Sequence, residues 1–343
     1  MQQRDIETQL LECFLRYVRI ETTSDRNADT IPSTPGQWDL LRLLKEELDE
    51  MGIEDVELDE NGFLVARIPA NTKSAETIGF MSHVDTVSDV SGAGVSPQVH
   101  ENYDGGPIRL SDDLSLDPSA EPELARFIGQ TIITTDGRTL LGADDKAGVA
   151  EMMTLASCLT DDGSLRHGEI ELIFTPDEET GNGMDHFPKD RVRSIACYTL
   201  DGSEEGVIET ECFEASKAQV VCNGVSIHTG TARGKLVNAI SMMSSFLEML
   251  PRSESPEATD RRYGFYAPIE VRGSVERSSC TILLRDFDHA ILDRRVNAIR
   301  SFGSAVEAAF PGGSVEIEIV RQYANMRSFL DADERIVSRL EEA

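Results

Sequence analysis

The sequence predicts an α/β protein, with a mixed sheet sandwiched by helices and a second, smaller α+β domain. Over the first two hundred residues, short apolar runs typical of strands alternate with segments of helical periodicity. Near residue 215 the pattern changes to a β-α-β-β-α-β order. The length of 343 residues suits about two domains. We expect the first domain at residues 1–214, continued by 323–343, and the second at 215–322.

The first domain is predicted from its apolar periodicity. Helical spacing indicates a helix at about residues 5–19. A second helix begins at Thr34, where proline suits the first turn and Gln37 completes a capping box. Residues 88–140 are rich in Gly, Pro, Asp and Ser, which predicts loops with a hairpin. A third helix follows Asp144. Strands are expected at 56–60, 63–68, 77–82, 169–174 and 195–200.

The second domain is predicted as a small sheet with its helices on one face. Its apolar runs alternate with two amphipathic segments, which favours this architecture over a second parallel sheet. In chain order the expected elements are a strand at 216–225, a helix at 236–250, paired strands at 267–276 and 279–288, a helix at 288–309 and a strand at 314–320.

Composition excludes several classes of function. The net charge of −30 argues against a nucleic-acid partner, because phosphates would be repelled. No apolar run approaches the roughly 18 residues of a membrane span, and the first residues lack the apolar core of a signal peptide. Six cysteines without a CxxC pair indicate reduced thiols. We therefore expect a cytoplasmic protein with neither a nucleic acid nor a membrane as partner.

Histidine and acidic residues follow several of the predicted strands. They are His83 and Asp85, Asp144-Asp145-Lys146, Asp177-Glu178-Glu179, and Asp201. Taken singly, each has an ordinary explanation: a satisfied histidine, a helix cap, solvated charge or a turn. Together they share the strand ends where open α/β sheets bind ligands. Because burying so many carboxylates without cations is unfavourable, the pattern predicts a divalent metal site.

The spacing within these clusters indicates different roles. Side chains two apart on a strand point to the same side, so Asp85 can accept a hydrogen bond from His83 and fix its tautomer. Neighbours in extended chain point to opposite sides. One of Glu178 and Glu179 can therefore bind metal while the other acts as general base toward a metal-bound water. The residues alone do not decide which.

Several motifs together resemble one family. "SHVDT", "LLGADDKAG", "TPDEETGNG", "YTLDG" and "GVSIHTGTARGKLVNAI" are similar to the peptidase T family of aminotripeptidases. That family belongs to the co-catalytic di-zinc exopeptidases, which include carboxypeptidase G-like enzymes and aminoacylases. "VHENYDGGPI" and "RDFD" match peptidase T more than the wider clan. The resemblance runs to about residue 327 and implies a di-zinc catalytic domain with a lid or dimerisation domain.

The resemblance also implies site residues. Asp85 would orient the histidine and Glu178 would be the general base. His228 would stabilise the oxyanion of the scissile carbonyl and so bind substrate. Arg285 is a candidate anchor for a substrate carboxylate, with a structural ion pair to Asp286 or Asp288 as the alternative. Two Zn²⁺ would be held by His83, Asp144, Glu179 and Asp201, with Asp144 bridging them.

The function expected from the resemblance is a zinc-dependent aminopeptidase that releases the N-terminal residue of tripeptides by attack of a metal-activated water. A deacylase or carboxypeptidase of the same clan, or a non-catalytic fragment that binds metal or dimerises, are the alternatives. Short peptides are the expected partners, and a homodimer through the second domain is a further option.

One departure from the family concerns the end of the chain. The sequence ends at "ERIVSRLEEA", before the family's Arg-Gly-Gly-Thr-type segment and its last metal-binding histidine. We therefore expect part of the catalytic domain to be missing, and one zinc to lack a protein ligand.

Overall fold

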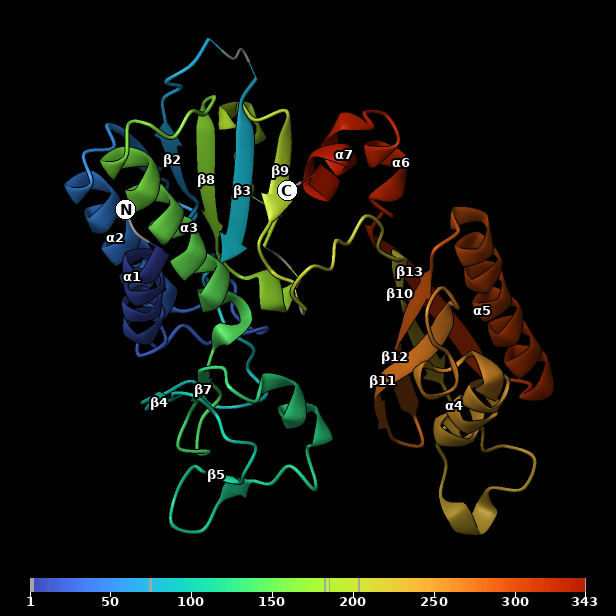
Figure 1. Cartoon of the computed structure of the whole chain (residues 1–343). Helices are drawn as coiled ribbons and strands as arrows, with labels where there is room; N and C mark the ends of the chain where they lie inside the picture. Colours follow the sequence, from blue (N-terminus) through green and yellow to red (C-terminus); the bar gives the residue numbers. More distant parts are fainter. Residues whose placement is uncertain (1–2, 74–75, 182, 185, 203, 343) are drawn as a thin grey trace. The chain divides into compact units, whose positions relative to one another are not determined.

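The computed structural model describes residues 3–73, 76–181, 183–184, 186–202 and 204–342. It divides into two compact units, residues 1–205 and 206–343 (Figure 1). Each unit has its own apolar core. The finer boundaries predicted above, including a return of 323–343 to the first domain, stay predictions.

The first unit is built on a five-stranded mixed sheet in the order β1-β2-β8-β3-β9. Strand β3 pairs in parallel with β8 and β9, whereas β2 pairs antiparallel with β1 and β8. The predicted α/β class is confirmed. The strands are β1 (Asp55–Leu58), β2 (Leu64–Ile68), β3 (Ile78–His83), β8 (Ile170–Thr175) and β9 (Ala196–Thr199).

Three helices pack with this sheet around one core (Figure 1). They are α1 (Gln3–Tyr17), α2 (Pro35–Glu50) and α3 (Ala143–Asp161). The apolar stripe of α2 buries Leu41, Leu44 and Leu48 completely, and each such burial contributes about 1.5–3 kcal/mol. The start of α2 is confirmed, but the predicted capping box is wrong. Thr34 makes no side-chain hydrogen bond to the helix backbone, and Gln37 bonds instead to the loop after β8.

The loop-rich excursion contains two short strand pairs, so the predicted hairpin is confirmed. Strand β5 (Ile108–Arg109) pairs with β6 (Ser115–Leu116). Strand β4 (Gln98–His100) pairs with β7 (Ile132–Thr134). A 3₁₀ helix at Pro122–Phe127 lies between them in the chain.

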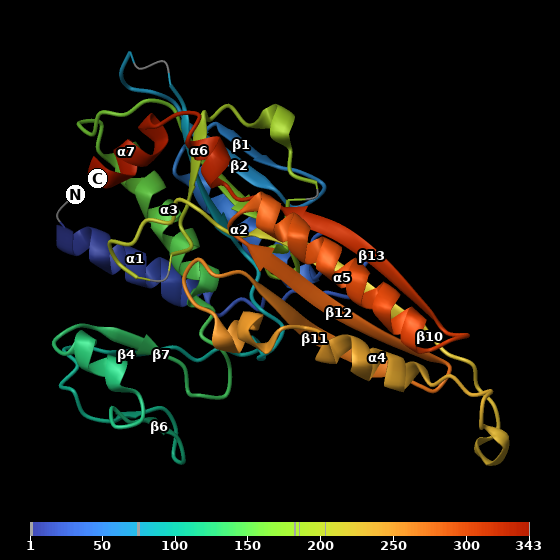
Figure 2. The ribbon, with the colours of Figure 1, turned by 90° about the vertical axis from the view of Figure 1, so that its right-hand side faces the viewer.

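The second unit carries a four-stranded antiparallel sheet in the order β11-β12-β10-β13. Helices α4 and α5 lie over β12 (Figure 2). This confirms the predicted β-α-β-β-α-β order. The elements are β10 (Glu214–Asn223), α4 (Ala239–Glu248), β11 (Phe265–Gly273), β12 (Arg277–Asp286), α5 (His289–Ala309) and β13 (Ser314–Tyr323), followed by α6 (Arg327–Leu330) and α7 (Arg335–Glu342). None of the described helices combines the length and hydrophobicity that crossing a bilayer requires.

A buried ion pair connects β2 and β8. Glu171 is fully buried and accepts a hydrogen bond from Arg67 Nε at 2.8 Å. It also accepts the backbone N–H groups of Arg193 and Ser194, the latter at 2.7 Å. Burial alone would raise the pKa of Glu171, but these hydrogen bonds outweigh it and lower the pKa. The ionised carboxylate therefore stabilises the folded state.

Replacing Glu171 by glutamine is expected to lower the free energy of unfolding by about 1.5–3 kcal/mol, because Arg67 would keep only its ion pair with Asp55, and the amide would have one acceptor oxygen in place of the two that accept Arg67, Arg193 and Ser194. Denaturant titration measures this loss. The folded-state pKa lies below the unfolded value, so the contribution is complete above pH 4.5 and is lost as the pH falls. The difference in unfolding free energy between wild type and Glu171→Gln should therefore become smaller as the pH falls below 4.5. The control Glu169→Gln alters a more exposed pair, for which about 1 kcal/mol or less is expected. Equal losses in both variants would contradict the prediction.

Candidate metal centre

The parallel strands bring the predicted site residues to one edge of the sheet. β3 ends at His83, β8 ends shortly before Glu178, and β9 ends two residues before Asp201. Because β3 pairs in parallel with both β8 and β9, these three chain ends leave the sheet on the same side. This is the placement that the strand ends in the sequence predict.

Three of the four predicted metal ligands form a tight group. The Nε2 atom of His83 lies 2.9 Å from an Asp144 oxygen and 3.8 Å from an Asp201 oxygen. One nitrogen and two carboxylate oxygens all lie within 4.8 Å of one another. His83 is buried, whereas the Asp144 side chain is 71% exposed. The histidine side of the group is thus buried and the Asp144 side is open to solvent. Its nitrogen and oxygen donors suit a divalent metal such as zinc.

Asp85 connects the histidine to the loop after β8. Its Oδ1 atom lies 3.2 Å from Nδ1 of His83, which leaves Nε2 facing the carboxylates. The same buried carboxylate accepts the backbone N–H groups of Glu178 at 3.0 Å and Glu179 at 3.1 Å. The spacing in the sequence predicts the contact with His83 but gives no sign of the second one. Asp85 therefore orients the histidine and also holds the loop of the two glutamates.

The centre contains more carboxylate groups than cationic groups. Burial raises the pKa of Glu178 and Glu179, and the charge of Asp144 raises both further. Burial would lower the pKa of His83, but its hydrogen bond to Asp85 and the surrounding carboxylates outweigh this and raise it to about 10. The neighbouring carboxylates thus contribute to all three shifts, and a divalent cation would offset their negative charge.

The start of α3 is anchored by the two residues after Asp144. Asp145 is buried and accepts the Ser82 hydroxyl at 2.6 Å and the His83 N–H at 3.1 Å. Burial raises the pKa of Asp145 to about 7. Lys146 is also buried and donates to the Ile20 carbonyl at 2.6 Å; burial lowers its pKa to about 8. Asp145 and Lys146 therefore hold α3 in place, which leaves Asp144 as the acid that faces the cluster.

Gly148 allows β9 to approach α3. A Cβ atom at this position would lie 2.1 Å from the Leu200 carbonyl oxygen, well inside van der Waals contact. Any side chain here would push away the end of β9 and with it Asp201. The glycine of the "ADDKAG" motif is therefore required to bring Asp201 near His83.

His228 lies in the second unit and is exposed. Its Nδ1 atom accepts the N–H of Gly230 at 3.1 Å. In the neutral imidazole the proton is then on Nε2, so the ring presents an N–H donor. This suits the predicted oxyanion contact, which itself remains a prediction.

Arg285 is buried in β12 and contacts no described acidic side chain. It donates to the carbonyls of Ser216 at 3.2 Å and Leu284 at 3.0 Å. The alternative of a structural ion pair is wrong, because Asp286 pairs with Arg295 at 3.0 Å and Asp288 caps α5. The proposed contact of Arg285 with a substrate carboxylate stays a prediction.

Comparison with known proteins agrees with these features. The model of peptidase family M20/M25/M40 matches residues 132–343. A curated peptidase T from Geobacillus thermodenitrificans is 42% identical over 341 residues, which covers 98% of this chain and 83% of that protein. Both matches include the "LLGADDKAG" and "TPDEETGNG" segments, which carry Asp144 and the two glutamates.

Solved structures share the fold at low identity. A tripeptidase from Staphylococcus aureus has a TM-score of 0.75 and 21% identity, with 98% of this chain and 80% of that chain covered. An aminopeptidase from Bacillus cereus has a TM-score of 0.71 and 21% identity, and the match covers 97% of this chain and 82% of that chain. A dinuclear metal-binding peptidase of the M20 family from Bacillus subtilis has a TM-score of 0.61 and 13% identity, and the match covers 99% of this chain and 81% of that chain. On its family model and its curated relatives, the chain is a peptidase and belongs to peptidase family M20/M25/M40.

Proposed function

We propose that the chain is a metal-dependent aminopeptidase that releases the N-terminal residue of tripeptides. The observation that carries this proposal is the group of His83, Asp144 and Asp201, whose ligand atoms lie within 4.8 Å of one another. The loop of Glu178 and Glu179 is held beside it by Asp85. Its relative in Geobacillus is a peptidase T, and two proteins of similar fold are described as an aminopeptidase and a tripeptidase.

We propose that the centre takes two divalent cations, which would be Zn²⁺, held by His83, Asp144, Glu179 and Asp201. The grouped donors of His83, Asp144 and Asp201 support this proposal. The carboxylates around His83, which outweigh the effect of burial and raise its pKa to about 10, also support this proposal, because their negative charge favours a nearby cation. The similar Bacillus subtilis protein is described as binding a dinuclear metal centre. When bound, such ions polarise a scissile carbonyl and lower the pKa of water.

The protein's own residues would handle the proton and the substrate. Glu178 would accept a proton from the attacking water at its carboxylate and return it to the leaving amino group; its raised pKa suits this exchange. Asp85 would keep the Glu178 backbone in place. His228 would donate from Nε2 to the developing oxyanion, and Arg285 would bind a substrate carboxylate.

Three further parts of the proposal rest on sequence features alone. The charge of −30 argues against nucleic acid as a partner, and short peptides are the partners that the family motifs imply. A homodimer through the second unit and a cytoplasmic location stay predictions. A deacylase or carboxypeptidase is the alternative activity, since both occur in the clan that the motifs resemble.

A peptide assay tests the proposal. The zinc-loaded chain is incubated with a tripeptide of three different residues and with its N-acetylated form, and products are identified by mass spectrometry. We expect the first residue and a dipeptide from the free peptide, and no product from the acetylated one. Release of the C-terminal residue would indicate a carboxypeptidase. Release of acetate would indicate a deacylase.

A further inference from the structure

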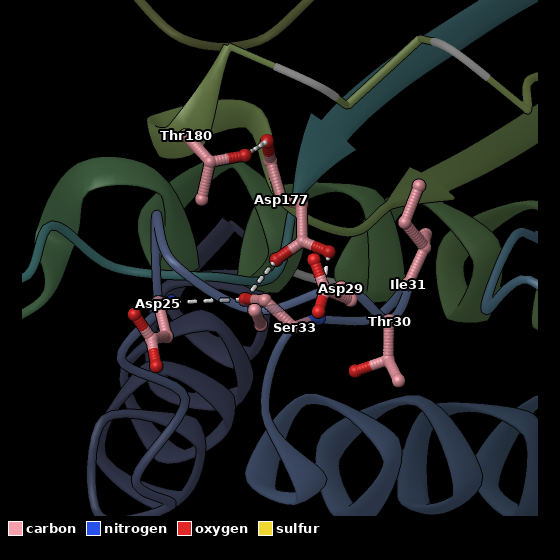
Figure 3. A pocket seen from close by; sticks show the side chains of 8 residues that line it. Asp25, Asp29, Thr30, Ile31, Ser33, Asp177 and Thr180 are labelled. Carbon is pink, nitrogen blue, oxygen red and sulfur yellow. Dashed lines mark hydrogen bonds between the residues drawn. The ribbon is translucent and has the colours of Figure 1, made fainter.

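Asp177 precedes the two glutamates and is turned away from the metal centre. It is only 1% exposed, and Figure 3 shows its carboxylate directed at Ser33, in the connection before α2. The Ser33 N–H donates to Oδ2 at 2.7 Å, the Ser33 hydroxyl donates to Oδ1, and Gln37 Nε2 donates to Oδ1 at 2.7 Å. Three neutral donors from a segment about 140 residues earlier thus satisfy a buried carboxylate.

Gln37 holds Asp177 at two points. Besides donating to the carboxylate, its Oε1 atom accepts the Asp177 backbone N–H at 3.1 Å. Gln37 is fully buried in the first turn of α2. A side-chain amide carries a donor NH₂ and an acceptor oxygen on the same uncharged group, and Gln37 uses one for the Asp177 carboxylate and the other for the Asp177 N–H. The glutamine therefore determines where both the side chain and the backbone of Asp177 lie.

The backbone at Asp177 directs the glutamates. Its φ of 55° and ψ of 28° place it in the left-handed region, which non-glycine residues seldom adopt. Thr180 closes the turn by donating its N–H and hydroxyl to the Asp177 carbonyl, at 3.3 and 2.9 Å. The loop is then held at one point by Gln37 and at another by Asp85.

Packing alone does not hold this loop. A cavity of about 160 Å³ borders the contact (Figure 3), and its lining includes Asp25, Asp29, Thr30, Ser33, Asp177 and Thr180. The loop has room to shift if its hydrogen bonds are removed. We infer that Gln37 and Asp177 are positioning residues that place Glu178 and Glu179 for metal binding and proton transfer. This inference rests on the proposed function.

An exchange of donor and acceptor tests the inference. In Asp177→Asn, the new amide NH₂ would face the NH₂ of Gln37, so two donors would meet. In Gln37→Glu, the new carboxylate would face that of Asp177, so two acceptors would meet. The double variant restores the bond, because Asn at 177 can donate to Glu at 37 while the Ser33 N–H still finds an amide oxygen. Two quantities are compared between variants: kcat on the tripeptide with zinc, with KM determined alongside it, and the rate of amide hydrogen exchange of residues 176–181 in the metal-free chain.

We expect each single variant to lower kcat roughly 10- to 100-fold with little change in KM, since small misplacements of catalytic groups have effects of this size. Exchange at residues 176–181 should become faster in both. The double variant should recover both quantities. The matched control Asp39→Asn removes a carboxylate with 68% exposure from the same turn of α2, and should leave both unchanged.

Any of three results would overturn the inference. The first is single variants with wild-type exchange and kcat, and the second is a double variant no better than the worse single one. The third is a uniform fall in melting temperature without a local change in exchange. Absence of turnover in the unmodified chain would refute the proposed function instead. The exchange measurement, which needs neither metal nor substrate, would then still decide whether Gln37 and Asp177 hold the loop of the two glutamates.

Discussion

Replacing Glu178 by alanine should lower tripeptide turnover by about 10²–10⁴-fold, the range for loss of a general base. The metal content should stay close to that of the wild type. The physical reason is that Asp85 holds the backbone N–H of Glu178, not its side chain, so truncation leaves the loop in place. Initial rates and elemental analysis of the same preparation measure the two quantities.

Glu179→Ala is the matched control. It removes a carboxylate of the same kind from the neighbouring position, whose backbone N–H is also held by Asp85. We expect this variant to lose bound metal as well as activity. If Glu178→Ala loses the metal and Glu179→Ala keeps it, the two roles are exchanged. The structure permits that outcome, because Glu178 and Glu179 are neighbours in one 3₁₀ turn and Asp85 holds the backbone N–H of both.

Removing metal with a chelator should abolish turnover and lower the melting temperature, and added Zn²⁺ should restore both. Without cations, the carboxylates near His83 repel one another, as the raised pKa values of Glu178 and Glu179 indicate. A ligand that binds only the folded state stabilises it by about 2.7 kcal/mol at a hundred times its Kd. Calorimetry with and without zinc measures this gain.

Asp144→Asn provides the control for metal removal. It keeps the size of a side chain that lies 2.9 Å from His83 Nε2 but removes its charge. Its melting temperature should respond little to zinc. Full turnover in a chelated sample with no measurable metal would contradict a metal-dependent mechanism. A stabilisation by zinc that persists in Asp144→Asn would place the metal elsewhere.

Much of the site could be predicted from local spacing. The alternation of apolar runs and helical segments predicts the sheet, and parallel strands bring their ends together wherever they lie in the chain. A spacing of two on one strand is enough to predict the contact of Asp85 with His83. These inferences depend on backbone geometry that the residues themselves encode. The extended chain expected at Glu178 and Glu179 is wrong, because both residues lie in a 3₁₀ turn that follows the left-handed Asp177, so their separate roles stay a prediction.

Contacts between distant segments could not be predicted in this way. Gln37 has the spacing of a capping box, yet its amide bonds to Asp177, about 140 residues later. Arg285 is followed in the sequence by Asp286 and Asp288, yet its guanidinium donates to backbone carbonyls. The carboxylate of Asp286 pairs with Arg295 instead. Asp85 accepts two N–H groups from a loop on another strand.

The sequence by itself therefore determined which residues are at the strand ends and which acids share a face. Only the tertiary structure decided how the loop of the glutamates is held, since a buried carboxylate accepts whichever donors the fold brings within about 3 Å. Periodicity carries no information about those partners. For this peptidase, the sequence predicts the candidate metal ligands, and the fold provides the hydrogen bonds that hold the loop of Glu178 and Glu179.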